Sequence, residues 1–362
     1  MSMYVRGDLH VCPNPLSLDT YTICEYDCVY CFVKSMESSI RKRTALKGLQ
    51  PIDLKGFEKR ARRFLKYNLP VIVGRKCESL CDSEKKYWNT LKALKILGDL
   101  EFPTVIETKG RVLEKHKKVL KYLDSVSKAG ILMSVTPGSD ELARKLEPRL
   151  PVYSERFKMV KELREIGLWV GIKAEPIIPS INTDPKDIIA FADKCVEVGV
   201  NAVNFGDMRI FNPKIDYERW KRAGYSLLKI IRAKKKYWIG IGNFILKKLN
   251  ERGLKTACPD WINFGLLVDC ESCCGFDGAF NFHKFTFQHA LKVIRSKGVV
   301  KFGDIAKYNI FGKKALEKFK KIWNDTTGRY FTLSDVENVD VIGYDSEGNR
   351  IYGLVSNLRR NV

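Results

Sequence analysis

The stretch Leu18-Asp-Thr-Tyr-Thr-Ile-Cys24-Glu-Tyr-Asp-Cys28-Val-Tyr-Cys31 carries three cysteines in a CxxxCxxC spacing, directly after a run with strand character. Three thiolates on one loop can bind three irons of a cubane [4Fe–4S] cluster and leave the fourth iron without a protein ligand. A structural zinc site is the alternative, because Cys12 is near enough in the chain to supply a fourth thiolate. We therefore expect a metal centre at Cys24, Cys28 and Cys31, and the preceding strand favours the cluster.

Beyond this loop, short β-rich runs alternate with longer stretches whose apolar residues recur every three or four positions. Such alternation is typical of repeated βα units around a parallel sheet. The expected strands are Leu18–Ile23, Leu69–Gly74, Thr104–Thr108, Gly130–Val135, Trp169–Ala174 and Ala202–Phe205, and the expected helices include Tyr87–Leu97, Ser154–Ile166 and Lys186–Val198. The sequence thus predicts an α/β fold built on a partial (β/α)6 TIM-like barrel.

Conspicuous side chains fall where these predicted strands end. In such barrels the loops at the carboxyl ends of the strands carry the chemistry. The residues at these ends are Cys24, Cys77, Lys109, Ser134 and Glu175. We therefore expect them to gather at one mouth of the barrel.

Eleven cysteines, with nothing near the start that resembles an export signal, argue for metal rather than a disulfide framework. A CxxC core with flanking cysteines predicts a second Fe–S cluster or a zinc site, and buried structural thiols are the alternative. These residues are Cys258, Cys270, Cys273 and Cys274. Cys77 and Cys81 are candidates for metal ligands or for packed thiols. Cys195 lies on the apolar side of a predicted helix, which indicates the core.

The charge balance is strongly basic, with 64 Lys and Arg against 42 Asp and Glu, or +22 in 362 residues. Such a field attracts polyanions, so nucleic acid is the first partner that we expect. Solvated, lysine-rich helix faces are the alternative reading. No stretch is long and apolar enough to cross a membrane, so we expect a cytoplasmic protein with no membrane partner.

The C-terminal region has a different pattern. Helices are expected over Phe287–Lys297, Lys301–Tyr308 and Lys313–Trp323, followed by strands over Val339–Tyr344 and Arg350–Val355. Three helices and a hairpin favour a winged-helix-like α+β domain, although a cap that only packs on the barrel has the same elements. The third helix carries lysines suited to phosphates, namely Lys313, Lys314, Lys318, Lys320 and Lys321. We place a barrel at 1–245, a cysteine-rich segment at 246–284 and a winged-helix-like nucleic-acid-binding domain at 285–362.

Several motifs, in order, resemble those of radical S-adenosylmethionine (SAM) enzymes, and within them the spore photoproduct lyase and DNA repair photolyase-like group. The resemblance covers roughly residues 10 to 215. The motifs are Asn14–Phe32 with its cysteines, Glu107-Thr-Lys-Gly110, Leu146-Glu-Pro-Arg-Leu-Pro151 followed by Glu155-Arg156, and Gly171-Ile-Lys-Ala-Glu-Pro-Ile-Ile-Pro179.

The resemblance implies that a [4Fe–4S] cluster, reduced by a donor such as ferredoxin or flavodoxin, cleaves SAM to a 5′-deoxyadenosyl radical that abstracts hydrogen from a substrate. It implies that Tyr30 lies beside the SAM adenine, that Lys109 reaches the SAM carboxylate, and that Ser134 contacts the ribose or methionine part. Glu175 is a further cofactor-binding candidate.

Within the resemblance, Cys77-Glu-Ser79 is similar to a Cys-x-Ser segment in which the lyase keeps a hydrogen-donating cysteine, and Cys81-Asp-Ser83 fits almost as well. We expect the substrate to be a nucleic acid, either a DNA lesion or an RNA base. Modification of a protein or peptide, and a non-catalytic Fe–S nucleic-acid-binding regulator, are the alternatives.

Overall fold

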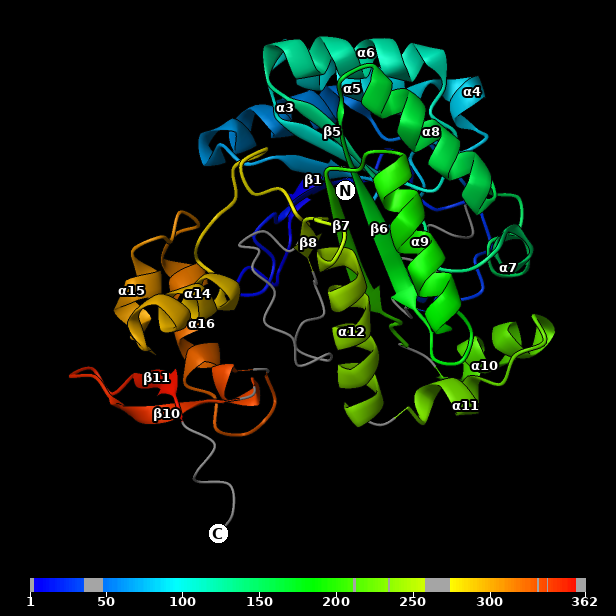
Figure 1. The fold of residues 1–362 in the computed structure, drawn as a ribbon. Coiled ribbons are helices and arrows are strands. Elements are labelled where there is room, and N and C mark those ends of the chain that lie inside the picture. Colours follow the sequence, from blue (N-terminus) through cyan, green and yellow to red (C-terminus); the bar gives the residue numbers. More distant parts are fainter. Residues whose placement is uncertain are drawn as a thin grey trace.

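The computed structural model describes residues 3–35, 48–210, 213–233, 235–257, 274–330, 332–336 and 338–355. Its main sheet has eight strands in the order β1 to β8, so neighbours in the sequence are neighbours in space (Figure 1). Only β1 is antiparallel to its neighbour, and the other strands pair in parallel. The strands are β1 (Met3–Val5), β2 (Leu16–Leu18), β3 (Val71–Val73), β4 (Thr104–Thr108), β5 (Ala129–Ser134), β6 (Trp169–Ile177), β7 (Ala202–Asp207) and β8 (Thr256–Ala257).

Helices between the strands cover one face of this sheet (Figure 1). The longer helices are α3 (Leu54–Phe64), α5 (Asn89–Asp99), α6 (Glu114–Val126), α8 (Tyr153–Glu165), α9 (Pro185–Glu197) and α12 (Lys235–Asn250). The shorter ones are α1 (Phe32–Ser35), η1 (Leu65–Tyr67), α4 (Glu84–Tyr87), α7 (Asp140–Leu146), α10 (Pro213–Arg222) and α11 (Leu227–Ile231). Aspartates start two of them, because the side chains of Asp53 and Asp184 accept hydrogen bonds from the first backbone amides of α3 and α9.

Alternate strand residues enter two separate apolar clusters, as the period of a strand requires. Val71, Val73 and Ile106 belong to the large core, whereas Ile72, Val105 and Leu132 pack with Phe276 and Phe280. Close packing on this second face explains Gly171, since a Cβ atom there would lie 2.9 Å from a Leu132 methyl carbon. The segment around Phe276 therefore covers the face of the sheet opposite the long helices.

The α/β fold and its parallel sheet are confirmed, with two differences. The strand predicted over Leu18–Ile23 is β2, which ends at Leu18, because the chain beyond it leaves β3 and pairs with Pro51 through Tyr21. The sheet also contains β1 and β8, which the predicted six strands lacked. These two strands have three and two residues, too few for a periodic signal.

The C-terminal part runs α14 (Phe287–Lys297), β9 (Val299–Val300), α15 (Phe302–Ala306), α16 (Lys313–Trp323), η2 (Leu333–Asp335), β10 (Val339–Tyr344) and β11 (Arg350–Leu354). β9, β10 and β11 form an antiparallel sheet in the order β10-β11-β9. Its core is aromatic, with ring centroids 5.0 Å apart for Phe287 and Phe319 and 5.1 Å apart for Trp323 and Tyr352. The predicted ends of α14 and α16 are correct.

The N-terminal segment joins this part to the barrel. The His10 ring lies 5.9 Å from the rings of both Phe287 and Phe319, and its carbonyl accepts the Phe287 amide at 2.8 Å. Lys318 of α16 donates to the Gly7 carbonyl at 2.7 Å. The apolar core is continuous across this contact, from the sheet to Phe319. The C-terminal part is thus docked by buried contacts.

Among the described residues, no helix combines the length and the apolar character needed to cross a membrane.

Candidate functional site

The three predicted cluster ligands lie on the loop between β2 and α1. Cys28 is buried, and Cys24 and Cys31 are partly buried in the same cluster, which also holds Cys77 and Cys81. Burial raises the pKa of Cys24 and Cys28, and the three thiols lie near enough to one another for their charges to add to these shifts. The fold therefore brings the thiols together.

The donor set of this loop fits a cubane by its chemistry. A cubane takes each thiolate on a different iron, whereas a zinc ion draws its ligands to one point. Within the described parts of the chain, no three His, Cys, Asp or Glu side chains surround a single metal-ion position. The thiol of Cys12, the candidate fourth ligand of a zinc site, donates to the Asn14 carbonyl at 3.3 Å and accepts from Arg75 at 3.7 Å.

Hydrogen bonds from neighbouring loops hold the backbone of the cysteine loop and its Glu25 side chain. Glu25 accepts from the amide and hydroxyl of Ser83 at 3.0 and 2.7 Å, and its carbonyl accepts from Arg149 at 3.2 Å. The Val29 amide donates to the Leu146 carbonyl at 2.8 Å. The conformation of the loop therefore depends on residues that lie far away in the sequence.

Tyr30, Lys109 and Ser134 belong to one connected group. The Tyr30 hydroxyl donates to the Glu147 carboxylate, and the Lys109 ammonium lies 5.8 Å from the centre of the Tyr30 ring. Glu147 is paired with the buried Arg156, which donates to the Ser134 carbonyl at 2.9 Å. Burial raises the pKa of Glu147, although Arg156 opposes the shift.

A carboxylate that sequence reasoning missed, Glu78, ties the loop after β3 to the loop after β4. It accepts from the Lys109 amide at 2.7 Å, the Thr108 hydroxyl at 2.6 Å and the Leu80 amide at 2.9 Å. The two loops approach so closely that a Cβ atom at Gly110 would lie 2.3 Å from the Leu80 carbonyl oxygen. These contacts fix the backbone at Lys109.

Ser79 sits beneath this contact and is fully buried. Its carbonyl accepts from the Thr90 hydroxyl at 2.6 Å, and its own hydroxyl has no hydrogen-bond partner among the described residues.

Glu175 lies in a charged group at the carboxyl end of β6. The Lys173 ammonium is 3.3 Å from Glu175 and 3.0 Å from Glu107, and the Arg75 guanidinium lies 3.7 Å from Glu107. Burial alone would raise the pKa of Glu107, but Lys173 and Arg75 outweigh it and lower this pKa to about 2. Glu107 is thus ionised at neutral pH.

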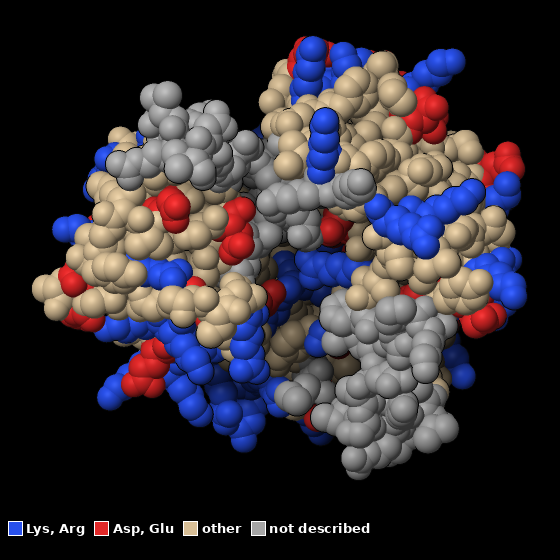
Figure 2. Space-filling model, turned by 90° about the horizontal axis from the view of Figure 1, so that it is seen from below, with Lys and Arg blue, Asp and Glu red and all other residues tan. Residues whose placement is uncertain are grey.

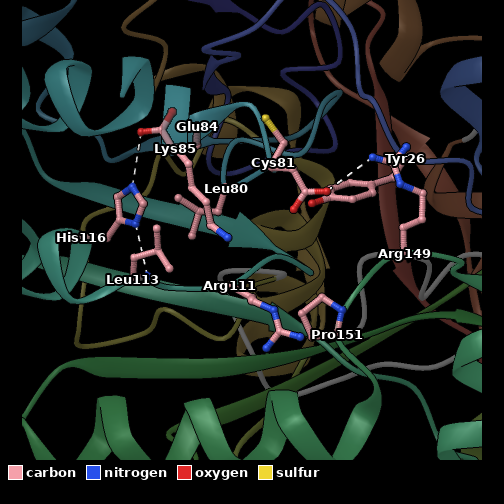
Figure 3. A pocket seen from close by; sticks show the side chains of 11 residues that line it. Tyr26, Leu80, Cys81, Glu84, Lys85, Arg111, Leu113, His116, Arg149 and Pro151 are labelled. Carbon is pink, nitrogen blue, oxygen red and sulfur yellow. Dashed lines mark hydrogen bonds and ion pairs between the residues drawn. The ribbon is translucent and has the colours of Figure 1, made fainter. Parts of the chain in front are cut away.

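A pocket open to solvent lies beside the cysteine loop (Figure 3). Cys81 lines it together with Tyr26, Arg111 and Arg149. The other candidate thiol, Cys77, is directed elsewhere, since it donates to Asp19 at 3.8 Å and to the Tyr21 carbonyl at 3.5 Å. Of the two, Cys81 is the thiol at the wall of this pocket.

His116, which also lines the pocket, is structural. Its Nδ1 accepts from the Leu113 amide at 3.2 Å, and its Nε2 lies 3.3 Å from Glu84 (Figure 3). His116 caps α6 and is fully buried, and His283 and His289 are buried too.

The second cysteine group falls mostly outside the described residues, namely Cys258, Cys270 and Cys273. Cys274 is described, and it is buried in the apolar cluster with Leu132 and Phe276. A second metal site therefore stays a prediction. Cys195 is fully buried in the main core, as predicted.

Comparison with known proteins points to the part of the chain that contains the cysteine loop. Residues 18–195 match the sequence profile of the Radical SAM superfamily. No curated protein sequence matches the chain well enough to count as a relative.

Among solved structures, a mutant of spore photoproduct lyase has a TM-score of 0.56 and 11% identity, over 72% of this chain and 79% of that one. Spore photoproduct lyase complexed with dinucleoside spore photoproduct has a TM-score of 0.54 and 12% identity, over 70% and 80%. Streptococcus suis SuiB bound to precursor peptide SuiA has a TM-score of 0.47 and 17% identity, over 68% of this chain and 49% of that one, so the chain spans about half the length of SuiB.

At these identities, the structural likeness to the lyase shows the fold alone. The superfamily in general uses SAM and a [4Fe–4S] cluster. The profile match therefore identifies residues 18–195 of this chain as a radical SAM domain.

Proposed function

We propose that this chain is a radical SAM enzyme that acts on a nucleic acid, and that Cys24, Cys28 and Cys31 hold its cluster. The observation that carries the proposal is the convergence of these thiols on the loop after β2, inside the matched domain. When bound, the cluster supplies an electron, received from a donor such as ferredoxin or flavodoxin, for the reductive cleavage of SAM.

The residues around the loop are suited to hold SAM. We assign Lys109 to the SAM carboxylate, because its ammonium is a strong donor beside the thiols. Tyr30 offers a ring for the adenine, and Glu147 fixes its hydroxyl. Ser134, Ser79 and Glu175 are the further candidates for SAM contacts.

Of the two candidate hydrogen-donating thiols, we favour Cys81. A thiol that returns hydrogen to a substrate must face a space that the substrate can enter. Cys81 lines the pocket beside the cysteine loop, whereas the Cys77 thiol is engaged by Asp19 and the Tyr21 carbonyl.

The C-terminal part supports nucleic acid as the substrate class. The order α14–β9–α15–α16–β10–β11, with an antiparallel sheet, suits a winged-helix-like domain in residues 285–362, whose third helix is the recognition helix. Lys314 and Lys321 of α16 are exposed. Lysine and arginine side chains gather along the lower left edge and in the central hollow of the face in Figure 2.

The experiment that tests the substrate class is isotope transfer. DNA, RNA and a peptide pool from cells grown in heavy water are each incubated with the reconstituted enzyme and unlabelled SAM. Deuterium in 5′-deoxyadenosine reports the molecule that lost hydrogen. We expect label from DNA or RNA and not from peptides, and label from peptides alone would contradict the proposal.

A further inference from the structure

Arg219 lies in α10, outside the residues that match the superfamily profile, yet it reaches the cysteine loop. Its Nη1 donates to the Cys31 carbonyl at 2.9 Å, and its Nη2 donates to the Cys28 carbonyl. A planar guanidinium with two donors fixes orientation as well as position. One side chain therefore holds the backbone at two of the three cysteines.

The guanidinium is itself held in place. Arg219 is 7% exposed, and it lies 3.6 Å from Asp216 of its own helix and 3.9 Å from Asp27 of the cysteine loop. Asp27 also pairs with Lys34 at 2.8 Å. Because a buried charge is costly unless it is paired, these neighbours explain why Arg219 stays between helix and loop.

The next residue of α10 holds the same loop by apolar contact. Trp220 is buried in a cluster with Val29 of the cysteine loop and with Leu227 and Ile230 of α11. Arg219 thus binds the backbone of the loop while Trp220 packs against its side chains. The helices α10 and α11 form a support for the loop that the superfamily match does not include.

We propose that Arg219 is a positioning residue that keeps the cysteine loop in its ligand-presenting shape before metal binds, and whose charge raises the reduction potential of the bound cluster. A loop that is already ordered in the metal-free chain does not lose its conformational entropy when its thiols bind the metal. A fixed positive charge near a cluster stabilises its reduced form, because nearby charges and hydrogen bonds set the reduction potential of Fe–S clusters. The second half of the proposal rests on the proposed function, whereas the first half concerns the metal-free chain.

The test compares three variants of the full chain. Arg219→Met removes both hydrogen bonds and the charge, and Arg219→Lys keeps the charge but lacks the planar pair of donors that fixes two carbonyls in one orientation. Arg222→Met is the matched control, because Arg222 is an exposed arginine of the same helix that donates to the Glu218 carbonyl.

Two measurements address the position of the loop. In metal-free protein, mass spectrometry follows alkylation of Cys24, Cys28 and Cys31, and both Arg219 variants should react at least about tenfold faster than the wild type and the control. In reconstituted protein, both should lose iron to a chelator about tenfold faster or more. A third measurement addresses charge: the midpoint potential should fall in Arg219→Met and stay near the wild type in Arg219→Lys.

Wild-type alkylation rates in both Arg219 variants would overturn the positioning role. An unchanged potential in Arg219→Met would overturn the charge effect. If Arg219→Met failed to fold, Arg219→Lys would still decide the positioning role. A wild-type chain that takes up no cluster would refute the proposed function, yet the alkylation rates would still decide the role of Arg219.

Discussion

The cysteine loop (residues 24–31) and helix α16 are held in the molecule in different ways. Side chains from distant elements bind the backbone of the loop, Arg149 at Glu25 and Arg219 at Cys28 and Cys31. Helix α16 instead packs its apolar face, with Phe319 and Trp323, into the core and leaves most of its lysines in solvent. Substitution of one buried residue that holds the cysteine loop should therefore disturb the whole loop. Substitutions of single lysines on α16 should instead have small and independent effects.

The largest effect on stability should come from the buried ion pair behind the site. Arg156→Met leaves the buried Glu147 carboxyl without its cationic partner, so we expect the free energy of unfolding to fall by about 3–5 kcal/mol. The control is Arg111→Met, which breaks a pair with Glu155 whose side chains are 56% and 44% exposed, and it should cost less than about 1 kcal/mol. Denaturant unfolding measures both, and equal losses would contradict the difference in burial.

A smaller effect should appear in the decline of the free energy of unfolding at acid pH. Because the pKa of Glu107 is about 2 in the folded chain, against 4.5 for an unperturbed glutamate, its ionisation stabilises the fold above pH 4.5. That contribution, at most about 3 kcal/mol, is lost as the pH falls from about 4.5 to about 2. Glu107→Gln should flatten the decline of unfolding free energy over this window. The exposed-site control Glu165→Gln should keep the wild-type slope, and a wild-type slope in both would refute the assignment.

The smallest effect should be on nucleic-acid affinity. Changing Lys314 and Lys321 together to Gln should reduce the slope of log K against log salt for duplex DNA by about 1.8, or about 0.9 for each phosphate contact. SAM cleavage without substrate should be unchanged. Lys318 is left in place because it anchors α16 to Gly7. Lys118 and Lys121, on α6, provide the matched double control, and an equal change in slope there would assign the effect to overall charge.

What the sequence can predict differs between the same two regions. Strands of five or six residues, such as β4, which is buried on both faces, and helices with a clear apolar stripe, such as α16, can be predicted because the pattern lies within the segment itself. The short strands β1 and β8 do not, since their pairing depends on neighbours that are already in place. The thiols of the loop were recognisable from their spacing alone.

The supports of the site were not predictable in the same way. Arg219 has no local pattern that distinguishes it from other charged residues, and it lies 188 residues from Cys31 in the sequence. Glu147 stands in a motif of the resemblance, but its contact with Tyr30, 117 residues away, is not visible in that motif. Glu78 stands one residue from Cys77, but its bond to the Lys109 amide depends on the neighbouring loop. Long-range backbone contacts of this kind leave no periodic signal in the sequence.

Production of 5′-deoxyadenosine tests the central claim most directly. The wild-type chain, reconstituted without oxygen with iron and sulfide, is mixed with SAM and dithionite, and the products are quantified by mass spectrometry. Cys195→Ala is the control, because it removes a buried thiol of the core, away from the loop. The account predicts that wild type and Cys195→Ala form 5′-deoxyadenosine and that Cys28→Ala forms none. Cleavage of SAM by Cys28→Ala at the wild-type rate would contradict it.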